Sequence, residues 1–416
     1  MHVCVIGAGV IGVTTAWQLA RQGLQVTLVD GAAGPASGAS HANGGQLSYS
    51  YVAPLAGPGV LPNLPAWLLS PDSPLRFRPR ADPRQWRWCL QFLRACNARA
   101  ASATTAQLLS LSYLSRQVLH EIQQEDPLDF AHVRNGKLIV YRTPALLEKA
   151  RGQVALQAGL GSEQQVLDTA QLIALEPALA PARSRLAGAV YTPSEEAGDC
   201  ALFTQGLFDR LASMDGVSLR MGVRVRRLER QGSRLKRLSM ADGGSIEADQ
   251  FVLAAGLESR ELLAALGERA PLYPLKGYSL SLPCRGAEAP AISVTDYERR
   301  TVYARLGDTL RIAAMVGIGV PGEGIEADRI ALVKRQTHEL LPEADLAAAR
   351  AWAGQRPATA DGKPRIGRSR AADNLWLNIG QGALGFTLAC GSAHLLQSLM
   401  NGATPAIDPA PFQPDC

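Results

Sequence analysis

The sequence lacks the cysteine pairs that bind zinc or build a disulfide framework. Its seven cysteines are scattered through 416 residues, their number is odd, and none forms a Cys-x-x-Cys pair. This usage argues against a disulfide-stabilised secreted domain and fits a reducing compartment. We therefore expect free cysteines, with Cys89 and Cys96 as buried packing residues, and we expect no metal site.

Long apolar runs and export signals are also missing. No stretch of about 18 consecutive apolar residues occurs, so we expect no membrane-spanning helix. The chain starts with an apolar stretch at 2–6 in place of a basic segment and a cleavage site, which argues against a secretory signal. The apolar segment 55–69 is broken by Pro58, Pro62 and Pro65. We expect a packed connection there, with a lid or a membrane-touching loop as the alternative.

Charge is scarce as well. Charged residues make up 19% of the chain, the net charge is +5, and no lysine and arginine block suited to nucleic acid is present. The mild positive balance suits an anionic substrate or membrane surface, although a slightly basic globular protein is the simpler interpretation. The length allows more than one domain, and the 47% hydrophobic content is typical of a globular enzyme.

The first 30 residues predict a strand, a helix and a second strand that together bind a dinucleotide. Residues 7–12 read Gly-x-Gly-x-x-Gly, directly after an apolar strand and at the start of a helical pattern. The glycines allow a tight turn, close approach of a pyrophosphate and close helix packing, and the helix N-terminus favours phosphate. Asp30 lies 18 residues after Gly12, where a carboxylate accepts hydrogen bonds from a ribose. This fingerprint does not separate NAD from FAD.

The rest of the chain predicts an α/β fold with a discontinuous Rossmann-like cofactor domain and a substrate domain with a mostly antiparallel sheet. Apolar periodicity predicts helices over 84–126, 145–158, 169–175, 326–350 and 387–399, and strands over 137–141, 217–256, 272–282 and 301–316. A second glycine cluster at 380–385 suggests that the C-terminal region meets the same cofactor. We expect 1–80, 186–268 and 346–416 to form the cofactor domain, and 81–185 and 269–345 the substrate domain.

Several motifs, in order along the chain, resemble one flavoprotein family. They are Val-Ile-Gly-Ala-Gly-Val-Ile-Gly (5–12), Ser-His-Ala-Asn-Gly-Gly-Gln-Leu-Ser (40–48), Glu-Ala-Gly-Asp-Cys-Ala-Leu-Phe-Thr-Gln (196–205), Tyr-Pro-Leu-Lys-Gly-Tyr-Ser-Leu (273–280), Arg-Pro-Ala-Thr-Ala-Asp-Gly-Lys-Pro (356–364) and the run Leu-Trp-Leu-Asn-Ile-Gly-Gln-Gly-Ala-Leu-Gly-Phe-Thr-Leu-Ala-Cys-Gly-Ser (375–392). This chain is similar to the D-amino acid dehydrogenase small-subunit family, within the glycine oxidase and D-amino acid oxidase superfamily.

The resemblance implies non-covalent FAD, bound by backbone-lined loops from the whole chain. The positions that it assigns to the cofactor are Ile6, Gly7, Gly9, Val10, Ile11, Gly12, Asp30, Ser40, Ala42, Asn43, Gly44, Gly45, Gln46, Leu47, Val225, Ala255, Gly256, Gly354, Gly380, Gly382, Ala383, Leu384, Gly385, Phe386 and Thr387. Gln381 stands where many members have histidine, so this side chain can form hydrogen bonds but cannot titrate.

An amino acid substrate calls for an arginine, because a planar cation binds a carboxylate through two parallel hydrogen bonds. The resemblance places Arg356 over the flavin, and Arg305 is the alternative anchor. Tyr303 and Tyr278 are candidates for a second hydrogen bond to the carboxylate, and Tyr51 for a lid residue.

The reaction implied is hydride transfer from the substrate Cα to flavin N5, giving an imine that hydrolyses to a 2-oxo acid and ammonia. No side-chain base is evident, so catalysis would rest on orientation and electrostatics. The partners expected are a small D-amino acid and a quinone or other acceptor, without nucleic acid. The expected location is cytoplasmic, with peripheral contact to the inner face of the membrane.

Alternatives remain at this stage. They are a glycine, sarcosine or D-proline type oxidase that uses oxygen, a D-hydroxyproline dehydrogenase, and a non-catalytic flavin-binding subunit.

Overall fold

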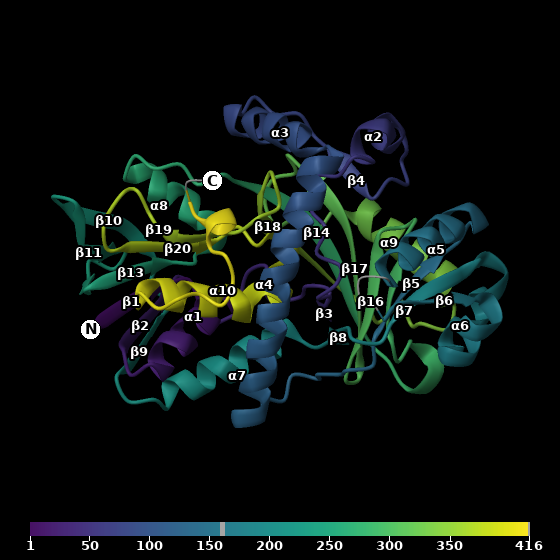
Figure 1. Ribbon diagram of the computed structural model, residues 1–416, viewed down its shortest axis with the longest axis horizontal. Helices are drawn as coiled ribbons and strands as arrows, with labels where there is room; N and C mark the ends of the chain where they lie inside the picture. Colours follow the sequence, from purple (N-terminus) through teal and green to yellow (C-terminus); the bar gives the residue numbers. More distant parts are fainter. Residues whose placement is uncertain (159–162, 415–416) are drawn as a thin grey trace.

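Two β-sheets lie side by side, with the long helix α4 (Ala98–Glu125) crossing in front of the junction between them (Figure 1). The computed structural model describes residues 1–158 and 163–414. A separate two-stranded ladder is formed by β3 (Gln46–Leu47) and β8 (Glu196–Ala197).

The first sheet is built from distant parts of the chain. Its six strands, in spatial order, are β19 (Arg365–Arg368), β20 (Leu375–Ile379), β13 (Gln250–Leu253), β1 (His2–Ile6), β2 (Gln25–Asp30) and β9 (Val217–Met221). All pairs are parallel except that of β19 with β20. The central strands are apolar on both faces because each face is covered, as in other parallel sheets.

One face of this sheet is covered by helices and the other by a small sheet. Val3 and Val5 pack toward α1 (Val10–Arg21), α7 (Cys200–Ala212), α10 (Gly385–Met400) and α4. Cys4 and Ile6 face the opposite core, formed with α8 (Ser259–Ala265) and the strands β10 (Val225–Gln231), β11 (Arg234–Met240) and β12 (Ser245–Glu247).

The second sheet has nine strands and is mostly antiparallel. Its order is β18 (Arg350–Thr359), β14 (Leu272–Pro283), β17 (Thr309–Ile318), β16 (Thr301–Leu306), β15 (Ser293–Asp296), β5 (Lys137–Tyr141), β7 (Gly188–Thr192) and β6 (Gln165–Asp168), with β4 (Leu75–Phe77) also pairing with β17. The helices of this half are α5 (Pro144–Ala158), α6 (Thr169–Leu175) and α9 (Ala327–Leu340), with the 3₁₀ segment η1 (Pro177–Arg185).

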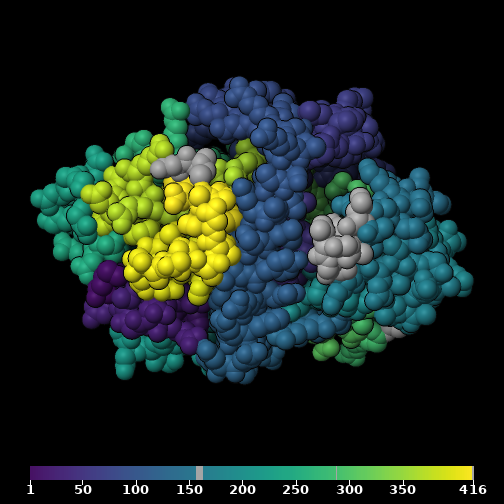
Figure 2. Space-filling model, viewed as in Figure 1, coloured from purple at the N-terminus to yellow at the C-terminus, as the bar shows by residue number. Residues whose placement is uncertain are grey.

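Two further helices, α2 (Val60–Leu69) and α3 (Pro83–Ala95), project above the sheets at the top of the molecule (Figures 1 and 2). The packed connection expected over 55–69 is therefore wrong for its second half. Pro62 lies in the first helical turn, where no intrahelical N–H bond is lost, and Pro65 removes a single bond, so the helix persists.

The mixed α/β fold and most expected elements are confirmed, with three further differences. The helical stretch expected over 84–126 is divided into α3 and α4 at Cys96 and Asn97. Residues 301–316 form two strands, β16 and the start of β17, because Gly307 turns the chain at a φ of +61°. The helix expected over 326–350 ends at Leu340, and Arg350 already begins β18. The division into two domains stays a proposal, and β4, β7 and β18 pair in the nine-stranded sheet although their segments were assigned to the cofactor side.

The cysteines and the most apolar helix are accounted for by packing. Within the described residues six cysteines are free and all but the half-buried Cys89 are buried, while Cys416 lies outside the described residues. One described stretch, Gly382–Met400, has the length and hydropathy of a membrane span, but 67% of it is buried inside the protein. Its contacts with α1 and α4 explain that composition.

Candidate active site

A cavity of about 1790 Å³ lies between the two sheets. Ordinary small-molecule sites occupy about 300–1,000 Å³, so this space is large enough for a dinucleotide together with a second ligand. Its walls are the loop after β1, the segment 37–48, residues 254–258, residues 381–387, and the inner face of the nine-stranded sheet.

The glycine loop after β1 is shaped for close backbone approach. A Cβ at Gly12 would lie 1.7 Å from the Gly7 carbonyl oxygen, so α1 packs against the loop only with glycine there. A Cβ at Gly9 would meet nothing closer than the Ser40 hydroxyl at 3.4 Å. Gly9 is the N-cap of α1 and supplies no capping side chain. The helix amides therefore stay accessible to an anionic group in the cavity.

Asp30 ties the glycine loop to the end of β2. Its two carboxylate oxygens accept hydrogen bonds from the backbone N–H of Ala8, at 2.6 Å, and of Ala32, at 2.7 Å. The side chain is only partly buried and lines the cavity. Each oxygen retains a lone pair for a further donor, as recognition of a ribose requires.

The segment 40–48 runs from α1 across the cavity floor to α10. The Ser40 hydroxyl accepts a hydrogen bond from the Val10 N–H at 3.0 Å. The Gln46 side chain donates to the Ser293 hydroxyl on β15 at 2.5 Å, and the Ser48 N–H donates to the Thr387 hydroxyl at 3.3 Å. These bonds fix the position of the segment, in which a Cβ at Gly45 would lie 2.9 Å from Leu306 Cδ2.

The C-terminal glycine cluster brings another helix N-terminus to the cavity. The chain turns at Gly380, with a φ of +88°, into the 3₁₀ turn η4 (Gly382–Leu384) and then into α10. No side chain caps α10, so its first amides face the cavity. A helix N-terminus at this place stabilises negative charge on a bound ring.

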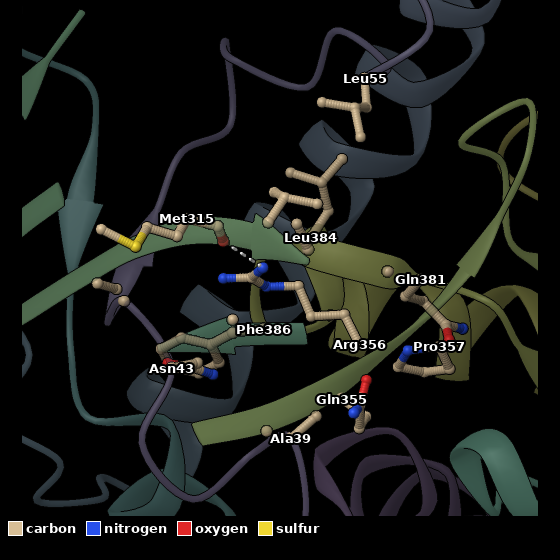
Figure 3. A pocket seen from close by; sticks show the side chains of 18 of the residues that line it. Ala39, Asn43, Leu55, Met315, Gln355, Arg356, Pro357, Gln381, Leu384 and Phe386 are labelled. Carbon is tan, nitrogen blue, oxygen red and sulfur yellow. Dashed lines mark hydrogen bonds between the residues drawn. The ribbon is translucent and has the colours of Figure 1, made fainter. Parts of the chain in front are cut away.

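Arg356 extends from β18 into the cavity toward the carbonyl of Met315, with Phe386 and Asn43 opposite (Figure 3). Its Nη1 donates to that carbonyl at 3.1 Å, and its guanidinium lies against the backbone of Gly277. No described carboxylate forms an ion pair with it, whereas Arg311 and Arg365 each pair with an aspartate. Burial lowers the pKa of Arg356. A desolvated cation without a counter-ion is suited to bind an anionic ligand.

The other expected substrate contacts divide between the cavity and the core. Tyr278 lines the cavity, but its hydroxyl donates to the Glu326 carboxylate. Tyr51 also lines it, with its hydroxyl 2.5 Å from that of Thr192, and burial raises the pKa of Tyr51 to about 12. Gln381 lines the cavity and donates to the Asn378 side chain at 2.7 Å.

Tyr303 is in the wrong place for a carboxylate contact. Its side chain has no exposed surface and packs in the core of the nine-stranded sheet. The neighbouring Val302 lines the cavity instead, because successive side chains of a strand face opposite sides. The alternative anchor Arg305 also fails, since its Nη1 donates to the Gly286 carbonyl at the exposed edge.

Most of the expected cofactor positions line the cavity. Gly12, Leu47 and Gly380 do not, because Gly12 and Gly380 serve the turns behind the wall and Leu47 is buried in the core. The remaining expected positions do line it, namely Ile6, Gly7, Gly9, Val10, Ile11, Asp30, Ser40, Ala42, Asn43, Gly44, Gly45, Gln46, Val225, Ala255, Gly256, Gly354, Gly382, Ala383, Leu384, Gly385, Phe386 and Thr387.

Two residues of the wall were missed in the sequence. Lys137 is 6% exposed and lines the cavity, and its Nζ donates to the Ser48 hydroxyl at 2.9 Å. Burial lowers the pKa of Lys137 to about 8, against the opposing effect of Glu195. A lysine that opens an apolar, buried strand was the available signal. Met315 has a φ of +70°, which aims its carbonyl at Arg356, and no sequence signal marks this conformation.

Comparison with known proteins shows the family of the chain. The family model described as FAD dependent oxidoreductase matches residues 2–399. The chain is 48% identical to D-amino acid dehydrogenase 2 of Ralstonia nicotianae over 99% of both chains. It is also 48% identical to D-amino acid dehydrogenase 2 of Pseudomonas aeruginosa, over 98% of this chain and 96% of that protein. The fold resembles glycine oxidase from Geobacillus kaustophilus, with a TM-score of 0.77, 21% identity, and coverage of 99% and 97%.

The chain belongs to the FAD-dependent oxidoreductase family, and its cofactor is FAD. The cavity fits this cofactor. Two unblocked helix N-termini suit its phosphates and its ring, a carboxylate at the end of β2 suits its ribose, and the space exceeds that of a small substrate.

Proposed function

We propose that the protein oxidises a small D-amino acid to a 2-oxo acid and ammonia, with Arg356 binding the substrate carboxylate. The observation that carries this proposal is a half-buried guanidinium in the cavity wall, with no acidic partner among the residues that the structure describes. The relatives named D-amino acid dehydrogenase support the substrate class.

In this proposal the chain acts by orienting its substrate. When bound, FAD accepts a hydride from the substrate Cα. The Met315 carbonyl holds Arg356 Nη1, so the remaining guanidinium donors point at the ligand. The apolar residues Leu384 and Phe386 border the same space and exclude water from the reacting carbon. A fixed cation in a low-dielectric site requires little reorganisation during the reaction.

Anaerobic reduction of the holoenzyme by a panel of D- and L-amino acids tests the proposal. We expect small D-amino acids to bleach the flavin and their L-enantiomers to leave it oxidised. Bleaching by sarcosine or glycine alone would favour an amine oxidase, and bleaching by D-hydroxyproline alone a narrower dehydrogenase. Absence of bleaching by every amino acid would leave only a flavin-binding role.

We further propose that electrons leave to a quinone, at the cytoplasmic face of a membrane that the protein touches from outside the bilayer. Residues 51–100 contain seven arginines and two aspartates, a net charge of +5 that equals that of the whole chain. The same segment exposes Leu61, Leu69 and Trp86. Apolar and cationic side chains together favour an anionic lipid surface.

Vesicle flotation tests this contact. Wild-type protein should float with phosphatidylglycerol vesicles and much less with phosphatidylcholine vesicles, and Leu69→Glu should weaken flotation while leaving reduction of the flavin by substrate unchanged. Equal recovery with both vesicles would contradict it.

A further inference from the structure

Beneath α2 and α3 the cavity continues into a space lined by apolar side chains. We call this space the apolar branch and define it by Leu64, Trp67, Phe77, Trp88, Phe92 and Ile318. The branch is continuous with the site already described, because the same cavity is lined by Val316, which follows Met315, and by Arg356. These six side chains carry no charge, so the branch does not suit the carboxylate or the ammonium of an amino acid.

The walls of the branch favour a flat ring as ligand. Trp88 and Phe92 stack at 5.2 Å with their planes 13° apart, and Phe77 meets Trp86 edge-on at 6.1 Å. The aromatic faces present large, rigid contact surfaces, and planar rings stack against such surfaces. A flexible aliphatic ligand would gain less from the same walls.

Helix α2, which lies above the branch, presents an apolar surface at its entrance. α2 has no charged residue and buries only Val60. Leu68 is 49% exposed and Leu69 is 84% exposed at its C-terminal end. An uncharged helix that buries a single residue is unusual on a surface that faces water, because exposure of its apolar side chains to water is unfavourable in free energy. The entrance therefore favours ligands that arrive from an apolar phase.

We propose that the apolar branch binds the electron acceptor, a lipophilic quinone that enters between α2 and α3. This inference rests on the proposed function, since it names the site at which the reduced cofactor is reoxidised. The quinone takes up two electrons and one proton from the reduced cofactor and a second proton from solvent, and leaves as the hydroquinone, which returns the cofactor to its oxidised form.

The proposal assigns separate tasks to the two ends of the cavity. The end at Arg356 takes a charged amino acid, and the end at Phe92 takes an uncharged ring, so each excludes the other's ligand by desolvation cost. Substitutions in the branch are therefore expected to change acceptor kinetics without changing reduction by the amino acid.

Leu64→Trp tests this separation, because a larger side chain fills the branch and leaves the Arg356 end intact. The holoenzyme is assayed with a small D-amino acid and either a short-chain ubiquinone analogue or ferricyanide, a hydrophilic acceptor. We expect the KM for the quinone to rise at least tenfold, with the ferricyanide rate and anaerobic flavin reduction within twofold of wild type. Leu90→Ala, on the exposed face of α3, is the matched control and should change none of these.

Quinone binding in the absence of substrate gives an independent readout. The ubiquinone analogue should quench the tryptophan fluorescence of the wild-type holoenzyme, and the quenching should saturate as its concentration rises. Leu64→Trp and Phe92→Ala should each raise the apparent Kd at least fivefold. An unchanged quinone KM and Kd in both variants would overturn the proposal. A loss of the ferricyanide rate as large as the loss of the quinone rate would also overturn it. A flavin that no amino acid bleaches would refute the proposed function alone, since the quenching experiment needs no turnover.

Discussion

The two walls of the cavity are made in different ways. The cofactor wall consists of backbone, supplied by short loops that follow β1, β13 and β20. The substrate wall consists of side chains, brought together when β5, β14, β16, β17 and β18 pair in one sheet. A wall made of local loops follows from local sequence, whereas a wall made by strand pairing depends on which face each strand presents.

The largest expected effect comes from blocking the cofactor wall. Gly9→Val adds a side chain that meets only the Ser40 hydroxyl in the protein but occupies the space in front of the α1 amides. We expect the purified variant to retain its circular dichroism spectrum and to contain less than about a tenth of the wild-type flavin. Gly34→Ala, where a Cβ meets nothing within 4 Å, is the control and should keep its flavin. Full flavin content in Gly9→Val would contradict a phosphate site here.

On the substrate wall, Arg356→Met should lower kcat/KM for the D-amino acid roughly 100-fold. Removing one partner of a buried charge pair costs about 2–5 kcal/mol, and about 1.4 kcal/mol corresponds to a factor of ten. Flavin content should stay unchanged, which separates the two walls. Arg305→Met, at the exposed edge, should change kcat/KM less than twofold, and a larger loss there would revive it as the anchor.

The buried Lys137 on the substrate wall lowers the free energy of unfolding of the protein at neutral pH. Its folded-state pKa of about 8 lies below its ordinary value of 10.5, so between these values the unfolded chain binds a proton that the folded protein does not. Stability therefore rises with pH across this window. Lys137→Met should be more stable than wild type at pH 7 by about 2 kcal/mol, and the difference should shrink by pH 10 in urea titrations. A difference independent of pH would show that Lys137 is protonated in the folded protein.

A smaller effect is expected beside Arg356. A Cβ at Gly277 would lie 2.3 Å from Arg356 Nη2, so Gly277→Ala must displace the guanidinium. We expect the substrate KM to rise roughly tenfold, equivalent to about 1.4 kcal/mol, with a smaller change in kcat. An unaltered KM would mean that Arg356 does not act from its observed position.

The smallest effect should come from Tyr303→Phe. Because this tyrosine packs in the core and Val302 faces the cavity, steady-state kinetics should stay within twofold of wild type. A tenfold loss of kcat/KM would show that the strand presents its other face to the substrate.

The sequence predicted the cofactor wall well because its signals are local. Gly7 and Gly9 lie in the turn between β1 and α1, Gly12 lies in the first turn of α1, and Asp30 ends the next strand. On the substrate wall, Arg356, Tyr278 and Tyr51 line the cavity as expected, whereas other positions were misplaced or overlooked. Tyr303 was misplaced because one residue decides the face of a strand, and Lys137 was overlooked because its partners Ser48 and Tyr51 are distant in the sequence. Pro65 within α2 also led to the prediction of a loop. The sequence does not show that the loss of a single backbone hydrogen bond leaves this helix intact.

The strand order of the first sheet has a consequence for biosynthesis. β19, β20 and α10 come from residues 365–400, yet β20 pairs with β13 in the first sheet and the start of α10 lines the cavity. A nascent chain lacks this part of the sheet until residues 365–400 have left the exit tunnel of the ribosome. Flavin binding that uses these amides therefore requires residues 365–400 to be made and folded, and we expect a chain truncated before residue 365 not to retain the cofactor.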